Sequence, residues 1–152
     1  MIQIPQDFLD FIQLLNGHGV DYLIVGGYAV ATHGYVRYTG DIDFFIALHP
    51  DNARKMVAVF HDFGFDRPEL DEKLFLEPGK IIRIGSEPMR LEVLNQIDGV
   101  EFAECYTSRV VLSLNGVNVN FIDLEHLLKN KRATARAKDK VDADELEKRN
   151  SN

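Results

Sequence analysis

Residues 22–48 read YLIVGGYAVATHGYVRYTGDIDFFIAL, which predicts two strands joined by a short helix. The stretch opens with a short apolar run that is typical of a buried strand, and the pair Gly26-Gly27 ends that strand. Residues 28–33 predict a short helix, and a second strand follows at 41–48. Chemically distinctive residues therefore stand at the end of the first strand and at the start of the second.

The second strand begins with two carboxylates, Asp41 and Asp43. Because residues i and i+2 of a strand share a face, both side chains point the same way. Two carboxylates about 5 Å apart repel by roughly 3 kcal/mol at an effective dielectric constant near 20, so a cation or a shared proton is expected between them. Mg²⁺ takes such oxygen ligands and holds nucleotide phosphates at its open positions. The alternative, and the commoner role of a lone Asp-x-Asp, is a turn with two solvated acids.

The glycine pair offers a second kind of site. Gly26 and Gly27 follow a strand and open a helix, where backbone amides and the helix dipole can hold a phosphate. The pair matches neither a dinucleotide-binding fingerprint nor a P-loop, and by itself it fits a structural tight turn better. Together, however, phosphate-binding amides at one strand end and paired metal ligands at the next suit phosphoryl or nucleotidyl transfer.

The rest of the pattern predicts a mixed α/β (α+β) sheet with helices mainly on one face. We expect helices at 5–17 and from 49 to about 64, a loop at 66–79, strands at 80–84 and 90–94, a helical piece at 102–106, a hairpin of 110–114 with 117–121, and a last helix, continuous or broken, from 123 to about 148. The hairpin is marked by Asn115-Gly116, because this dipeptide accepts the positive φ angles of a tight turn. No repeat or long linker appears, so residues 1–152 are expected to form one domain.

Composition narrows the class of protein. The chain has 152 residues, a net charge of −7 and a single cysteine, Cys105, which excludes an internal disulfide and fits a reducing cytoplasm. It shows no basic leader and no apolar run near the roughly 20 residues that cross a bilayer, so we expect a cytoplasmic protein without membrane contact. Its acidity argues against a nucleic-acid coat protein. Residues 129–140 nevertheless hold six lysines and arginines and one acid.

Taken together, these motifs resemble the minimal nucleotidyltransferases of the polymerase-β-like superfamily. The similarity is closest to the branch that includes AbiEii-type toxins and related uncharacterised bacterial and archaeal proteins. It rests on VGGYAV at 25–30, His33-Gly34, Arg37, Thr39 and DID at 41–43, and it continues in RLEVL at 90–94 and in residues 129–139. The resemblance implies a polymerase-β-like core that ends in a basic C-terminal helix.

The resemblance also implies a set of site residues. Asp41, Asp43 and a third carboxylate on a later strand, here Glu92, would be the catalytic residues and would hold Mg²⁺ (or Mn²⁺). The third acid is usually aspartate, and the longer arm of Glu92 could shift the metal. The residues implied to bind the nucleotide are Gly26, Gly27, Arg37, Lys131, Arg136 and Lys138.

Several of these residues have a structural alternative. Glu92 could equally be an ordinary exposed strand acid. Arg37 could clamp a phosphate, or it could simply neutralise one of the two paired aspartates. The basic residues of 129–140 could form a solvated helix face or contact the triphosphate. For His33 we expect the structural role of a cation near a helix C-terminus.

The function implied by the resemblance is transfer of a nucleoside monophosphate from an NTP to an acceptor hydroxyl on an RNA end, a protein or a small molecule. A toxin with an antitoxin partner would be one biological form of this activity. Two alternatives stay open: a catalytically inactive nucleotide- or partner-binding protein of the same fold, and an RNA-binding module that uses the basic C-terminal helix. The sequence specifies neither the NTP, the acceptor nor the oligomeric state.

Overall fold

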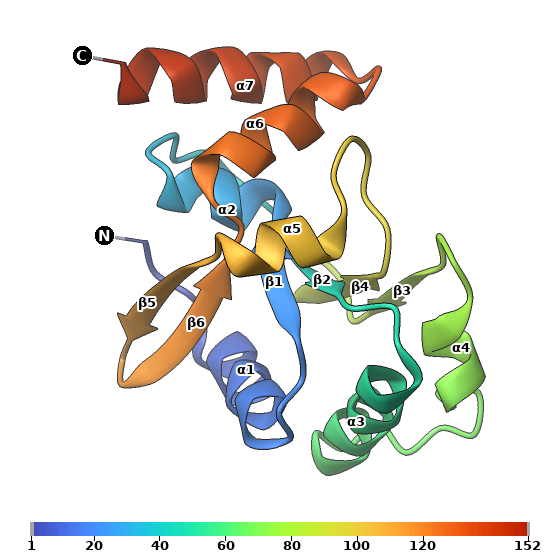
Figure 1. Ribbon diagram of the computed structural model, residues 1–152. Coiled ribbons are helices and arrows are strands. Elements are labelled where there is room, and N and C mark those ends of the chain that lie inside the picture. Colours follow the sequence, from blue (N-terminus) through green and yellow to red (C-terminus); the bar gives the residue numbers. More distant parts are fainter. Residues whose placement is uncertain (1, 152) are drawn as a thin grey trace.

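The computed structural model describes residues 2–151, in which six strands form one mixed sheet (Figure 1). The strands are β1 (Tyr22–Val25), β2 (Asp41–Ile46), β3 (Ile81–Ile84), β4 (Arg90–Leu94), β5 (Val110–Leu114) and β6 (Val117–Phe121). Their order across the sheet is β3-β4-β2-β1-β6-β5. Neighbouring strands are antiparallel except for β2 with β4 and β1 with β6, which are parallel. The predicted mixed sheet is confirmed.

Helices cover both faces of this sheet to different extents. They are α1 (Gln6–Gly17), α2 (Gly26–Thr32), α3 (Pro50–Asp62), α4 (Glu72–Leu76), α5 (Phe102–Thr107), α6 (Leu124–Ala133) and α7 (Ala137–Asn150). On one face, the ring of Phe11 in α1 lies 5.3 Å, between centroids, from Phe44 of β2 and from Phe60 of α3. The next residue of β2, Phe45, points to the other face and packs on Phe102 of α5 at 5.1 Å. The helices α1 and α3 therefore pack on one face of the sheet and α5 packs on the other.

The C-terminal helices lie apart from α1 and α3. Figure 1 shows α6 and α7 together at the end of the molecule where α2 lies, with α7 turning back over α6. The end of α7 is attached to the end of α2, because the Asn150 side chain donates to the carbonyl of His33 at 2.8 Å. The last predicted helix, which the sequence leaves as continuous or broken, is divided into α6 and α7. The break falls at Thr134, whose backbone is extended and whose hydroxyl donates to Asp139 at 2.7 Å.

One predicted element was wrong. The predicted loop at 66–79 contains the short helix α4. Asp71 caps this helix by accepting a hydrogen bond from the backbone of Leu74, and Phe75 stacks on Phe60 at 5.7 Å between ring centroids. A helix of five residues shows too little periodicity to be predicted, so its cap was the remaining signal.

The hairpin and the apolar character of the helices agree with the sequence pattern. Asn115 and Gly116 both have positive φ, 51° and 80°, and connect β5 to β6. None of the helices formed within residues 2–151 is long and apolar enough to cross a membrane.

Candidate functional site

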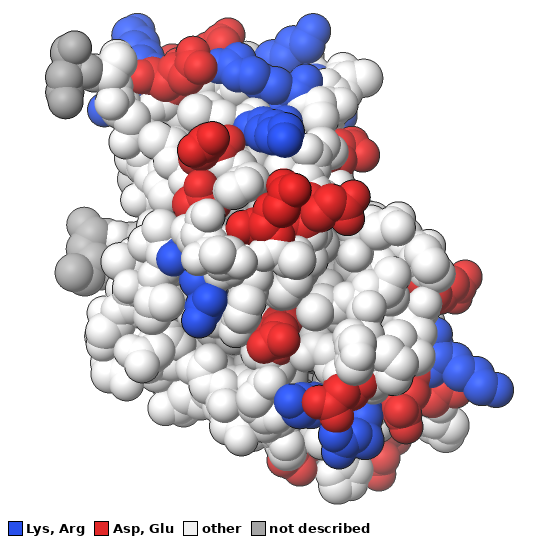
Figure 2. Space-filling view, viewed as in Figure 1, with Lys and Arg blue, Asp and Glu red and all other residues white. Residues whose placement is uncertain are grey.

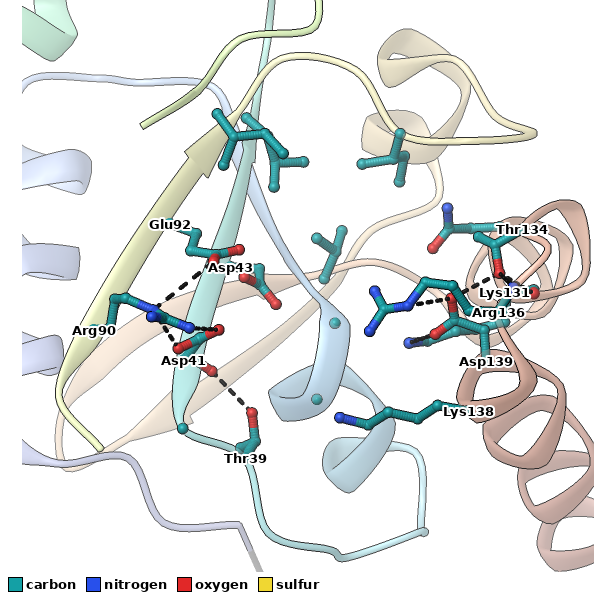
Figure 3. Close-up of a pocket in the computed structure, with 18 of the residues that line it drawn as sticks. Thr39, Asp41, Asp43, Arg90, Glu92, Lys131, Thr134, Arg136, Lys138 and Asp139 are labelled. Atoms are coloured by element: carbon teal, nitrogen blue, oxygen red, sulfur yellow. Dashed lines mark hydrogen bonds and ion pairs between the residues drawn. The ribbon is translucent and has the colours of Figure 1, made fainter. Parts of the chain in front are cut away.

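Three carboxylates meet on the second face of the sheet, where β2 and β4 run side by side (Figure 3). The register pairs Asp43 with Glu92 and Asp41 with Arg90. Alternation along each strand then places the three acids on one face. One carboxylate oxygen from each of Asp41, Asp43 and Glu92 lies within 4.8 Å of the other two. The structure therefore brings together the three predicted acids in an arrangement that could hold a divalent metal ion.

Asp43 shows how well such an ion would fit. Its Oδ1 atom is buried and has no hydrogen-bond partner among residues 2–151. Burial, followed by the hydrogen bond with Glu92 and the charge of Glu92, raises the pKa of Asp43 to about 8. An ionised carboxylate in this place is unfavourable unless a cation lies beside it. A hard divalent cation fits both the unpartnered Oδ1 atom and the all-oxygen donor set.

Two arginines that the motif analysis did not identify neutralise the other two acids. Arg90 donates two hydrogen bonds to Asp41, from Nε at 2.8 Å and from Nη2 at 3.0 Å. Arg83 of β3 donates from Nε to Oε1 of Glu92 at 2.8 Å. Alternation along the predicted strands places each arginine on one face or the other, but only the register between strands shows which acid it meets. That register depends on the whole sheet.

The glycine pair has a packing reason as well as a chemical one. Gly26 has a φ of +68°, and a Cβ atom there would collide with Oδ2 of Asp43. A Cβ atom on Gly27 would lie 2.6 Å from Oγ1 of Thr39, which in turn donates to the carbonyl of Asp41 at 3.0 Å. Glycine is therefore required at both positions to bring the first turn of α2 against the acids.

Arg37 forms an ion pair with α7 and not with the paired aspartates. The interpretation that it neutralises Asp41 or Asp43 is wrong, because its Nε and Nη2 atoms donate to the two carboxylate oxygens of Asp142 in α7, at 2.8 Å each. Asp41 has its own partner in Arg90, whereas the buried Asp142 requires a cation. This bond connects the loop after α2 to α7.

Lys131 is buried and does not belong to a solvated basic face. Its Nζ atom lies 2.9 Å from Oδ1 of Asp139 and 3.2 Å from Oδ2 of Asp142. Burial alone would raise the pKa of both aspartates, but the hydrogen bonds and cations around them outweigh it, so both pKa values lie below the ordinary one. We call Arg37, Lys131, Asp139 and Asp142 the charged quartet. It holds α6, α7 and the loop after α2 together.

Arg136 and Lys138 stand at the start of α7 and are exposed. Figure 3 shows Lys138 reaching toward the first turn of α2. All the predicted site residues border one cavity of about 850 Å³, which lies between the sheet and the C-terminal helices. They are Gly26, Gly27, Arg37, Asp41, Asp43, Glu92, Lys131, Arg136 and Lys138.

His33 has a structural role, as expected, although the contact differs from the one predicted. Its Nε2 atom donates to the carbonyl of Ile122 at 2.7 Å, directly after β6. The side chain therefore joins the end of α2 to the sheet. It is not among the residues that line the cavity.

A mixed sheet with glycines at the start of α2 and acids on β2 and β4 defines a nucleotidyltransferase-like fold. Two solved structures share it. A putative nucleotidyltransferase from Thermotoga maritima has a TM-score of 0.59 and 15% sequence identity, over 96% of this chain and 94% of that one. An antigenic nucleotidyltransferase-like protein from Paracoccidioides brasiliensis has a TM-score of 0.54 and 17% identity, over 94% of this chain and 75% of that one.

The chain belongs to the family of nucleotidyl transferases of unknown function (DUF2204), whose model matches residues 5–152. No curated protein sequence matches it. The predicted nucleotidyltransferase class and fold are therefore confirmed.

Proposed function

We propose that the chain transfers a nucleoside monophosphate from an NTP to an acceptor hydroxyl, using a divalent metal ion bound by Asp41, Asp43 and Glu92. The observation that carries this proposal is the meeting of three carboxylates within 4.8 Å of one another, one of which, Asp43, has a buried Oδ1 atom without a hydrogen-bond partner among residues 2–151. Such a donor set suits Mg²⁺ or Mn²⁺. Membership of a nucleotidyl transferase family supports an NTP as the donor.

The opposite wall of the cavity supports a triphosphate. The backbone amides of Gly26 and Gly27 would bind the β- and γ-phosphates at the first turn of α2. In the charged quartet, the two cations Arg37 and Lys131 are balanced by two aspartates. These two residues would therefore donate hydrogen bonds to the triphosphate without adding net positive charge to the cavity. The positive charge that balances the phosphates would come mainly from the exposed Arg136 and Lys138.

The reaction would be an in-line displacement at the α-phosphorus. A metal ion, when bound, supplies charge stabilisation at the phosphate oxygens. Glu92 accepts the proton of the acceptor hydroxyl, and the hydroxyl oxygen forms its bond to the α-phosphorus. The bond from the α-phosphorus to the oxygen that bridges to the β-phosphate breaks, and pyrophosphate leaves. Arg83 holds Glu92 in place for this step through its bond of 2.8 Å.

The domain organisation, the cellular location and the partner are also proposed. Residues 1–152 would act as one domain, the protein would work in the cytoplasm, and an antitoxin would be its partner if it acts as a toxin. A second candidate is a nucleotide-binding protein of the same fold without catalysis. The ion pairs of Arg90 with Asp41 and of Arg83 with Glu92 favour that candidate, because they give two of the acids a structural partner.

Labelled NTPs separate these functions. The protein is incubated with Mn²⁺ or Mg²⁺ and with the protein and RNA fractions of a cell extract, using NTPs labelled at the α- or at the γ-phosphate. We expect only the α label to reach an acceptor. Glu92→Gln should reduce the transfer about a hundredfold or more while NTP binding persists.

The control is Asp62→Asn, which removes an exposed acid at the end of α3 that does not line the cavity. This variant should transfer the α label normally. Transfer of the γ label, or α-label transfer that Glu92→Gln leaves unchanged, would contradict the proposal. NTP binding without any transfer would support the non-catalytic candidate.

A further inference from the structure

A second cavity adjoins the larger cavity that holds the site. It has a volume of about 630 Å³ and shares Gln96, Ile97 and Asp98 with the larger cavity. On the site face of the sheet, Leu94 follows Glu92 and Phe45 follows Asp43, each two residues further along its strand. Leu94 borders the larger cavity and Phe45 the second one. Leu94 lies about 7 Å from Glu92 along β4. A path therefore leads from Glu92 past Leu94 into the second cavity.

The lining of this second cavity differs chemically from the phosphate side. Its described lining contains no lysine and no arginine. It does contain two exposed acids, Asp98 and Glu101. Its apolar part includes Leu48, of which 40% is exposed, together with Phe102 at the start of α5. Figure 2 shows acidic side chains gathered over the position of α5.

The difference in charge between the two cavities suits them to different ligands. Four of the cations that line the larger cavity have an acid within 3.0 Å, namely Arg37, Arg83, Arg90 and Lys131. The other two, Arg136 and Lys138, stand at the start of α7, where the triphosphate is proposed to bind. The acceptor hydroxyl must then approach Glu92 from the other side, where the path runs past Asp98 and Glu101. An RNA acceptor would bring a phosphate with every nucleotide and would place this charge beside both acids.

We infer that the acceptor is a polypeptide that carries a serine, threonine or tyrosine hydroxyl, with an apolar residue and a lysine or arginine close to it. This inference rests on the proposed function and specifies its acceptor. The apolar residue would contact Leu48 and Phe102, and the basic residue would pair with Asp98 or Glu101. The hydroxyl oxygen gains the nucleoside monophosphate, its proton passes to Glu92, and pyrophosphate leaves.

The inference is tested with three probes of known structure. Two are octapeptides that share a central tyrosine and a leucine and differ only in carrying two lysines or two glutamates. The third is a single-stranded oligoribonucleotide with a free 3′ hydroxyl. Binding is followed by the amide chemical shifts of the full chain, which does not depend on catalysis, and transfer is followed with α-labelled NTPs.

We expect the lysine peptide to shift the amides of residues 96–102 and to bind at least tenfold more tightly than the glutamate peptide. Glu101→Lys should abolish that preference, because the new lysine offsets the charge of Asp98. Glu104→Lys is the matched control: it makes the same charge change on α5, at a residue that does not line the second cavity, and should leave the preference unchanged. If transfer occurs, the lysine peptide should be the best acceptor.

Three results would overturn the inference: the oligoribonucleotide shifts residues 96–102 in preference to the lysine peptide, Glu101→Lys leaves the preference unchanged, or neither peptide shifts these amides at millimolar concentration. A separate NTP titration distinguishes this failure from failure of the proposed function. Magnesium-dependent NTP binding with the wrong acceptor preference removes only the polypeptide acceptor, whereas loss of NTP binding removes both.

Discussion

Arg37 and Asp142 are separated by 105 residues and form a bidentate ion pair with two hydrogen bonds of 2.8 Å. The pair joins the loop after α2 to the C-terminal helix α7. Lys131 of α6 adds a third group, with its Nζ atom 3.2 Å from Asp142. The C-terminal helices are thus attached to the part of the chain that carries the glycines and the paired aspartates, and they form one wall of the site.

Replacement of Asp142 by asparagine should separate this wall from the sheet. The substitution leaves Arg37 and Lys131 without their shared carboxylate in a largely buried place, and breaking such a pair costs about 3 kcal/mol of unfolding free energy. Urea unfolding measures the loss. The matched control is Glu145→Gln, which breaks the exposed pair with Arg149 on the same helix and should cost less than about 0.5 kcal/mol. Equal effects of the two substitutions would contradict a structural role for the quartet.

Gly26→Ala should damage both stability and metal binding. A left-handed residue with a side chain costs roughly 1–2 kcal/mol, and its Cβ atom would also displace the Asp43 carboxylate. Gly116→Ala provides the control, since Gly116 has a φ of +80° but open space around its Cβ position. Both variants should lose stability in urea unfolding, and only Gly26→Ala should lose Mn²⁺ binding by calorimetry. Normal Mn²⁺ affinity in Gly26→Ala would refute the contact with Asp43 as a requirement of the site.

Arg90→Gln should bind Mn²⁺ more tightly than the wild type. The Arg90 guanidinium occupies both oxygens of Asp41 and places a positive charge beside the three acids. Removing this charge should raise the metal affinity by roughly threefold to tenfold, since it removes both competition and charge repulsion. Calorimetry with Mn²⁺ measures the change, and Arg54→Gln, which breaks an exposed pair with Asp51, should leave it unaltered. Weaker Mn²⁺ binding in Arg90→Gln would mean that Arg90 supports the metal site instead.

The raised pKa of Asp43 predicts an unusual pH dependence of stability without metal. Between its ordinary value of 3.8 and the folded value of about 8, Asp43 keeps a proton that the unfolded chain has lost. The folded state then binds more protons, so this residue lowers the unfolding free energy as pH rises, by at most about 1.4 kcal/mol per pH unit.

Comparison with Asp43→Asn isolates this effect, because asparagine does not titrate. In EDTA, the stability of the wild type relative to Asp43→Asn should fall from pH 5 to pH 8 in chemical unfolding. Saturating Mn²⁺ should remove the fall, because the metal ion favours the ionised carboxylate. A stability difference that does not change with pH in EDTA would show that Asp43 is ionised throughout this range.

Most of the fold follows from local patterns in the sequence. The apolar run of β1, the alternation around Asn115-Gly116 and the helical spacing of α1 and α3 each predict their element from a few neighbouring residues. The helix α4 could not be predicted in this way, because five residues contain little periodicity and its stability comes from packing of Phe75 on Phe60.

The site residues likewise include some that local sequence predicts and some that it does not. Asp41, Asp43 and the glycine pair are close in sequence, so local pattern is enough to predict them together. The bond between Arg90 and Asp41 joins residues 49 apart and depends on strand register, and the bond between Arg37 and Asp142 depends on how α7 docks. Local sequence shows neither the strand register nor the docking of α7. For this reason Arg90 was missed, and one of the two roles considered for Arg37, neutralisation of Asp41 or Asp43, was wrong.

The most direct test of the central claim is calorimetric titration of the protein with each of the four NTPs, in Mg²⁺ and in EDTA. The comparison uses an Asp41→Asn/Asp43→Asn variant and a matched control, Asp51→Asn/Asp62→Asn, which removes two exposed acids with the same change in charge. We predict magnesium-dependent binding of at least one NTP to the wild type and the control, and its loss in the site variant. Absence of binding of every NTP to the wild type, or unchanged binding in the site variant, would contradict the assignment of Asp41, Asp43 and Glu92 as a metal–nucleotide site.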